Sequence, residues 1–228
     1  MLLRIFAAMK FQIWLLVGLF TYALPLFAQE TTPPLSSNAI IAKSPIKPAY
    51  KAGEWFKFRI HYGIFNASYA TLALTEATWN GQPALYAKGI GRTTGLARLF
   101  FKVDDYYSSY FTKEDNRPLH FIRNINEGGY KKHLTIDFDH EQQQATVIDL
   151  KNETTGTYST DPEVQDLISF VYYLRKHLDV DVIQKDEFVV VNLFFDAENY
   201  AFKFKFLGRE TIKTKFGKVK TLKFRPYV

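Results

Sequence analysis

The chain has 228 residues, of which 47% are apolar and 23% charged, values typical of one globular domain rather than of a disordered or multi-span membrane protein. Lys and Arg together number 29 against 23 Asp and Glu, and because the excess is small and scattered it provides no basic patch for nucleic acid. The absence of cysteine excludes disulfides, thiol catalysis, cysteine metal sites and a bacterial lipid anchor.

The first 28 residues have the three parts of a secretory signal. Arg4 and Lys10 precede an apolar run over 11–27, and Ala28 is a small residue before a polar stretch. We predict a signal peptide over 1–28, cleaved after Ala28, and a mature protein free in the periplasm or secreted, with no integral membrane domain. The alternative is an uncleaved anchor, since the run approaches the roughly 20 residues that span a bilayer. Pro25 favours cleavage.

A Pro- and Ser-rich segment over 29–52 follows, and its composition is typical of a flexible lead-in. Period-two alternation then begins, with Phe56, Phe58 and Ile60 on one face and charged residues on the other, which indicates a half-buried strand. Aromatic residues make up 17% of the chain and also favour β structure. The same alternation predicts strands near 54–62, 70–74, 85–90, 106–112, 119–126, 130–138, 145–151, 188–195, 200–206, 210–215 and 219–224.

Helical spacing of apolar residues occurs over Asp161–Leu178. Asp161 is the expected N-cap and Pro162 the first helical residue, and basic residues fall in the last turn, where they complement the helix dipole. The apolar stripe of this helix consists of Val164, Leu167, Ile168, Val171, Leu174 and Leu178.

About ten or eleven strands with one mid-chain amphipathic helix predict a mainly β fold. We expect a single domain over 53–228, in which an antiparallel meander forms a barrel-like or strongly curved sheet closed by the helix. An outer-membrane barrel is the alternative architecture. The charged strand faces and the long helix in mid-sequence disfavour it.

Several short stretches resemble an exported bacterial family catalogued as domain of unknown function 3108. The resemblance implies a periplasmic, β-barrel-like fold with no assigned activity. Similar proteins continue past the Arg225-Pro226 region, so we expect a C-terminal truncation that leaves one strand edge unpaired. The stretches that carry the resemblance are Ala52-Gly53-Glu54 with Phe58, His61-Tyr62-Gly63 and Ala70; Val103 to Ser109; Asp166 to Ser169 with Tyr172 to Arg175; and Gly208-Arg209-Glu210 leading to Gly217.

No residue pattern indicates a catalytic or metal site, so we expect no cofactor. Asp104 and Asp105 are adjacent and would point to opposite faces of a strand, which favours a turn or edge role. No serine lies in a Gly-x-Ser-x-Gly motif, and the glycines from Gly89 to Gly95 lack both a P-loop ending and a helical pattern after them. The five histidines also lack metal-ligand spacing: His61, His120, His133, His140 and His177.

Charged residues beside apolar positions form a second candidate set. Arg209 and Glu210 lie near the end of the chain, and Asp166, Ser169 and Arg175 lie on the polar face of the predicted helix. We interpret them as ion pairs that fix the helix against the sheet. Contact with a ligand is the alternative.

The sequence therefore favours a non-enzymatic binding or maintenance module of the cell envelope. Its aromatic-lined interior would accommodate an apolar ligand, such as a lipid or glycan, or a segment of an envelope protein. One alternative is an envelope hydrolase that pairs Asp104 or Asp105 with Glu210 across a cleft. Another is a purely structural scaffold.

Overall fold

The computed structural model describes residues 48–62 and 65–227, in which eleven strands and two helices form. The predicted signal peptide and most of the predicted lead-in lie outside the described residues. The last residues of that lead-in are described. There Ala49 donates its backbone N–H to the Arg175 carbonyl at 3.0 Å, and the Tyr50 ring contacts Tyr172 edge-on.

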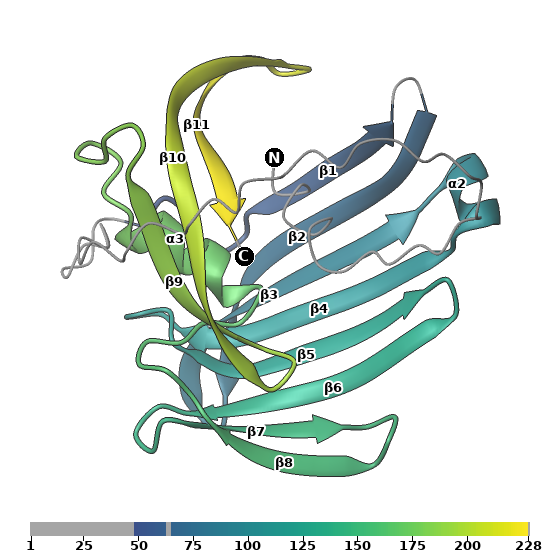
Figure 1. Ribbon diagram of the computed structural model, residues 1–228, viewed down its shortest axis with the longest axis vertical. Helices are drawn as coiled ribbons and strands as arrows, with labels where there is room; N and C mark the ends of the chain where they lie inside the picture. The colour runs from purple at the N-terminus through teal and green to yellow at the C-terminus, as the bar shows by residue number, and fades with distance from the viewer. Residues whose placement is uncertain (1–47, 63–64, 228) are drawn as a thin grey trace, which may run out of the picture. The chain divides into compact units, whose positions relative to one another are not determined.

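Eight strands form a large antiparallel sheet in chain order (Figure 1). The prediction of a meander is thus confirmed. Because β1 and β8 are its two edges, the sheet is open and strongly twisted, so the predicted barrel-like closure is wrong, whereas the alternative of an open curved sheet agrees with the structure. The strands are β1 (Trp55–Tyr62), β2 (Phe65–Trp79), β3 (Gln82–Thr93), β4 (Val103–Thr112), β5 (Pro118–Glu127), β6 (Tyr130–Asp139), β7 (Gln144–Asp149) and β8 (Thr154–Ser159).

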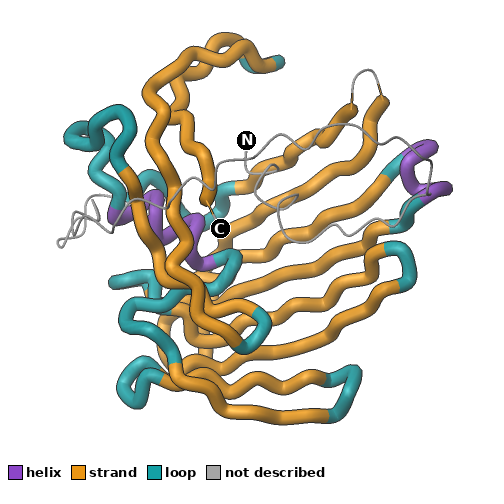
Figure 2. Tube along the Cα trace, viewed as in Figure 1, coloured by secondary structure: helices purple, strands orange, loops and turns teal. Residues whose placement is uncertain are grey.

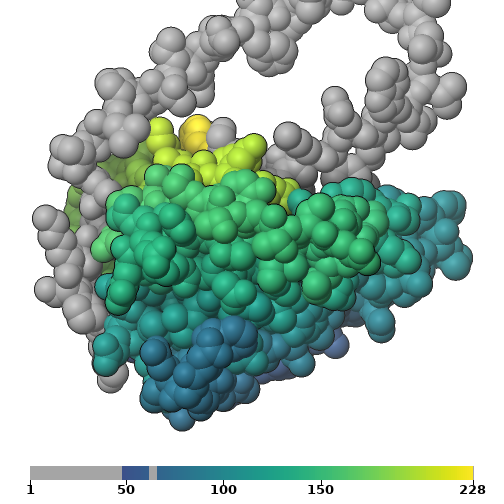
Figure 3. Space-filling model, turned by 90° about the horizontal axis from the view of Figure 1, so that it is seen from below, coloured from purple at the N-terminus to yellow at the C-terminus, as the bar shows by residue number. Residues whose placement is uncertain are grey.

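The last three strands form a separate small sheet in the order β11-β10-β9, so the expected single layer is also wrong. In Figure 3 its yellow to light-green residues lie on one side of the teal and blue residues of the large sheet. The two strands predicted over 200–206 and 210–215 are one long strand with an irregularity between Phe206 and Gly208. The small-sheet strands are β9 (Phe188–Phe195), β10 (Glu198–Thr214) and β11 (Gly217–Tyr227).

The core lies between the two sheets. We call the face of the large sheet that packs against the small sheet its inner face. Phe194 of β9 contacts the Phe138 ring edge-on at 6.0 Å, and Phe170 stacks on Phe204 of β10 at 6.1 Å. Such ring pairs add to the stabilisation from burial, because they favour edge-on or offset geometry. This packing explains the high aromatic content.

The mid-chain helix α3 (Ser169–His177) begins later than predicted. Asp161 and Pro162 do not start it, because Glu163 has a positive φ of 54° and Gln165 pairs with Leu193 of β9. The chain before α3 is therefore held by the small sheet. The C-terminal end of the predicted helix agrees with the structure.

A second helix, α2 (Gly95–Phe100), connects β3 to β4 where no helix was expected (Figure 2). Its six residues are too few to show helical periodicity. Neither α2 nor α3 has the length and apolar character that a bilayer-spanning helix needs.

Candidate functional site

Four polar side chains lie together on the inner face at the margin of the core, and we call them the inner-face cluster: Asp105, Tyr107, Arg123 and Glu127. The alternation of β4 and β5 places them on the face that also carries buried Phe121. In the strand register Tyr107 is opposite Arg123, whereas Asp105 and Glu127 lie toward the α2 end of the same two strands.

The surroundings of Asp105 in this cluster change the pKa of its carboxyl group. Partial burial and the neighbouring Glu127 carboxyl raise the pKa of Asp105 to about 7, against a weaker lowering by the Asn126 N–H and by Arg123. Burial raises the pKa of Tyr107 to about 12. At neutral pH Asp105 is therefore partly protonated, while the Tyr107 hydroxyl is neutral.

The turn between β9 and β10 covers Arg123, which is only 9% exposed. Asp196 in this turn accepts a hydrogen bond from Arg123 Nη1 at 2.6 Å and also pairs with Lys132. The guanidinium lies over the Phe195 ring, 4.5 Å from its centroid. Arg123 thus links the two sheets by charge as well as by packing.

Asp104 takes different partners on the outer face. Its carboxylate accepts hydrogen bonds from Arg92 Nε at 2.8 Å and from both terminal nitrogens of Arg98, and Lys102 Nζ lies 3.6 Å away. The Arg98 contact, with support from Arg92, lowers the pKa of Asp104. The adjacent aspartates therefore lie on opposite faces as predicted and form no acid and base pair with each other.

Asp166 and Ser169 belong to a buried capping network rather than to an ion pair. Asp166 Oδ1 accepts the backbone N–H groups of Ile168 and Ser169, each at 2.7 Å. Its other oxygen accepts the Ser109 hydroxyl of β4 at 2.5 Å. Burial raises the pKa of Asp166 to about 6 although these hydrogen bonds lower it. The network joins the start of α3 to the large sheet.

Arg175 makes the ion pair that joins α3 to the large sheet. Both of its terminal nitrogens bind the carboxylate of Glu54, which directly precedes β1, with Nη2 to Oε2 at 2.9 Å. The guanidinium also lies between 5.4 and 5.6 Å from the ring centroids of Tyr50, Phe56 and Tyr172.

Arg209 and Glu210 lie in the small sheet, and the contacts that they make here are not the predicted ion pairs to the helix. Arg209 donates to the Val180 carbonyl, and Glu210 pairs with Lys223 across β10 and β11 at 3.0 Å. Glu210 is therefore engaged within the small sheet. The structure brings Glu127, and not Glu210, to Asp105.

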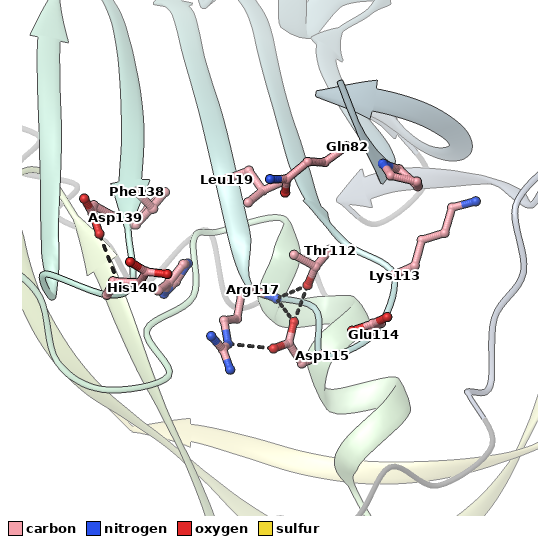
Figure 4. A pocket seen from close by; sticks show the side chains of 12 residues that line it. Gln82, Thr112, Lys113, Glu114, Asp115, Arg117, Leu119, Phe138, Asp139 and His140 are labelled. Carbon is pink, nitrogen blue, oxygen red and sulfur yellow. Dashed lines mark hydrogen bonds and ion pairs between the residues drawn. The ribbon is translucent and has the colours of Figure 1, made fainter. Parts of the chain in front are cut away.

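A cavity of about 750 Å³ lies at the opposite end of the large sheet from α2, among the β2–β3, β4–β5 and β6–β7 hairpins (Figure 4). Arg117 pairs with Asp115 at 2.6 Å, and Asp139 accepts two backbone N–H groups of its own turn. His140 Nε2 donates to the Pro118 carbonyl at 2.7 Å, and burial lowers the pKa of His140. The carboxylates of Asp115 and Asp139 each bind groups of their own hairpin.

The histidines lie in different elements. His61, His120 and His133 are in strands β1, β5 and β6, His140 is in the β6–β7 turn, and His177 ends α3. His120 Nδ1 lies 2.6 Å from Asp137, and His120 stacks on Trp79 with ring centroids 4.3 Å apart. Within residues 48–62 and 65–227, no three His, Cys, Asp or Glu side chains come together in a group that could hold a metal ion.

The fold and these contacts define a mainly β protein with two antiparallel sheets joined by a capped helix. A family model described as a protein of unknown function, DUF3108, matches residues 57–228. The chain belongs to the DUF3108 family, which confirms the resemblance seen in its sequence. No curated protein matches it.

This chain is similar to the crystal structure of a DUF1089 family protein from Pseudomonas aeruginosa. The two chains are 8% identical, the match covers 72% of this chain and 90% of the other, and the TM-score is 0.35. A similarity at this level supports no conclusion about function.

Sequence reasoning missed Tyr107, Arg123, Glu127 and Asp196. A usable signal existed for the first three, because the alternation of β4 and β5 places them on the face that carries apolar core residues. A charged residue at an inward-facing position is the feature to seek. Asp196 gives no such signal, since it lies in a turn 73 residues from Arg123.

Asp105 provides a prediction about pH. Its pKa is raised when the protein folds, so its contribution to stability is complete below about pH 4 and is lost as the pH rises through about 7. With allowance for partial exposure, we expect Asp105→Asn to remove about 1–2 kcal/mol of pH dependence in the free energy of unfolding between pH 4.5 and pH 8. Urea unfolding at several pH values measures it.

Asp104→Asn is the matched control. The pKa of Asp104 is lowered, so its contribution is present above its unfolded pKa and disappears only in more acidic solution. Asp104→Asn should therefore lower the free energy of unfolding by the same amount at every pH between 4.5 and 8. Equal pH profiles for wild type and Asp105→Asn would contradict the assignment.

Proposed function

We propose that this protein is an exported, non-enzymatic ligand-binding module of the cell envelope. The ligand would be an apolar molecule with a polar group, such as a lipid. It would bind on the inner face, beyond the part that the small sheet and α3 cover, with its polar group next to the inner-face cluster.

A change in burial along the inner face is the observation that carries this proposal. One cross-strand row, Leu74, Ala87, Ser109, Phe121 and Ile136, is buried throughout.

Four residues nearer α2, another row begins with Phe58, Ala70, Gly91 and Asp105, which are all partly exposed, and continues to the buried Ile125. The row offers an aromatic ring, a floor of small residues and a carboxyl group side by side. An elongated ligand could place its apolar part against the ring and the small residues and its polar part beside the carboxyl group.

Gly91 allows a direct test. A Cβ atom added there would lie 3.8 Å from the Asp105 Cβ, an ordinary contact, and its φ is not in the left-handed region. We expect Gly91→Leu to fold and to fill the space that the ligand would occupy. Native mass spectrometry of protein purified from cells should show an added mass on the wild type that falls at least fivefold in this variant.

Lys88→Leu is the matched control, because it adds the same side chain to the outer face of the same strand. It should keep the added mass. A wild-type protein that is repeatedly empty, or equal occupancy in both variants, would refute the proposal. Capture of one envelope protein by all three forms, without a small molecule, would instead indicate a scaffold.

An envelope hydrolase is the second candidate, and the Asp105–Glu127 pair favours it. Glycoside hydrolysis needs one protonated and one ionised carboxyl group. Burial, together with the neighbouring Glu127 carboxyl, raises the pKa of Asp105 to about 7 and so keeps it partly protonated near neutral pH. Release of soluble fragments from cell-wall glycan by the wild type, but not by Asp105→Asn, would support hydrolysis. Intact glycan in both reactions would exclude this candidate.

A further inference from the structure

Exposed apolar side chains gather at the connection between β3 and β4. Leu99 is 80% exposed, Phe100 87% and Leu96 62%, and Phe101, directly after α2, is also exposed. None of the residues of α2 is buried. This is a concentration of bare apolar surface that a soluble protein rarely keeps without a partner.

Polar contacts help to hold this connection in place. Arg98 Nη1 donates to the carbonyls of Thr93 at 3.4 Å and Val103 at 3.2 Å, while both its terminal nitrogens bind Asp104. The Thr94 N–H donates to the Ala67 carbonyl at 3.0 Å. The backbone is therefore fixed while its large apolar side chains face outward.

The surface continues onto the neighbouring hairpin. Gly128 donates its N–H to the Lys102 carbonyl at 2.8 Å, which places the β5–β6 turn beside the end of α2. Tyr130 at the start of β6 is exposed, and Lys131 next to it is exposed too. We call α2, Phe101, Lys102, Tyr130 and Lys131 the α2 surface.

The charge around the α2 surface is positive. Arg92, Arg98 and Lys102 all contact the single carboxylate of Asp104, so two positive charges remain uncompensated within this group. Lys131 adds a further positive charge. The α2 surface thus has Leu and Phe side chains surrounded by Lys, Arg and Tyr. Side chains of these types bind favourably at the boundary between lipid headgroups and acyl chains.

We propose that the α2 surface docks onto an anionic lipid bilayer, with Leu99 and Phe100 inserted among the lipids. The apolar side chains project from a short helix and do not line a groove. A lipid surface can surround such projections, whereas a folded partner would need a matching hollow. This proposal does not depend on the ligand-binding proposal above.

The absence of native cysteine permits a local test. In the full chain, Leu99→Cys is labelled with an environment-sensitive fluorophore and mixed with vesicles of phosphatidylethanolamine and phosphatidylglycerol. We expect a blue shift of the emission that is weaker at high salt and at least threefold smaller with vesicles of phosphatidylcholine alone. Because the signal comes from position 99, membrane binding by the N-terminal apolar run alone does not produce it.

Phe216→Cys is the matched control. Phe216 is 86% exposed at the β10–β11 hairpin and also has lysines beside it, but it lies outside the α2 surface. Its fluorophore should stay in water. No shift at position 99, or equal shifts at both positions, overturns the proposal.

A shift at position 99 that grows with protein concentration before vesicles are added indicates a second copy of the chain as the partner, and it also overturns the proposal. A second measurement uses the unlabelled protein. Leu99→Ser with Phe100→Ser should lower vesicle binding about tenfold in flotation, because two exposed apolar side chains no longer enter the lipid. Phe216→Ser should leave binding unchanged, and equal losses in the two variants would again refute the proposal.

Discussion

Replacement of Asp166 by Ala is expected to lower the free energy of unfolding by about 3–5 kcal/mol. The carboxylate satisfies two backbone N–H groups at the start of α3 and the Ser109 hydroxyl, all in a site closed to water. Alanine would leave three buried donors without an acceptor. Chemical denaturation followed by circular dichroism measures the loss.

Two further variants make this prediction specific. Asp166→Asn keeps the shape and one carbonyl oxygen, so its loss should be smaller than that of Asp166→Ala. Asp161→Ala removes the N-cap that the sequence predicts, but Asp161 lies well before α3, so we expect a loss below about 0.5 kcal/mol. A larger loss for Asp161→Ala than for Asp166→Ala would contradict the capping role described here.

Replacement of Arg175 by Met should cost about 2–4 kcal/mol, because it leaves the mostly buried Glu54 carboxylate without its partner. Methionine retains much of the apolar stem, so the loss reports chiefly on the charge and on contact with the three rings. The cost should fall to less than half in a Glu54→Gln background, where no charge is left unpaired. Thermal and urea unfolding of the four proteins in this cycle measure the coupling.

Arg209→Met is the control for Arg175→Met. Arg209 is exposed and donates to a single backbone carbonyl, so its loss should stay below about 1 kcal/mol. If Arg175→Met folds with full stability but loses ligand or membrane binding, the structural role of Arg175 is wrong and a ligand contact is favoured.

Local patterns predicted the strands well where one face is buried. The alternation from Phe56 to Ile60 gives β1 almost to the residue, since the apolar positions pack inward and the charged ones face out. Strand β8 was missed because Thr154–Ser159 lies at the sheet edge and is largely exposed, so it needs no apolar alternation. Helix α2 was missed because it is short and buries no residue.

The other errors in the predicted helix and candidate site arise from long-range pairing, which local sequence patterns do not show. The helical spacing of Val164 and Leu167 continues the stripe of α3, yet Gln165 between them bonds to β9 and the chain there is extended. The inner-face cluster could not be predicted for the same reason, because it also depends on long-range pairing. Asp105, Arg123 and Asp196 meet only after three distant segments have packed, and no spacing in the sequence specifies their partners.

The chain-order pairing of the strands also shapes how this protein reaches its native state. Each ladder of the large sheet joins segments adjacent along the polypeptide, so each can assemble as a hairpin at a small cost in loop-closure entropy. The contact between Arg123 and Asp196, which links the two sheets, by contrast spans 73 residues. We therefore expect the meander to form rapidly and the docking of the two layers to limit the rate, with aromatic surface exposed in the interval.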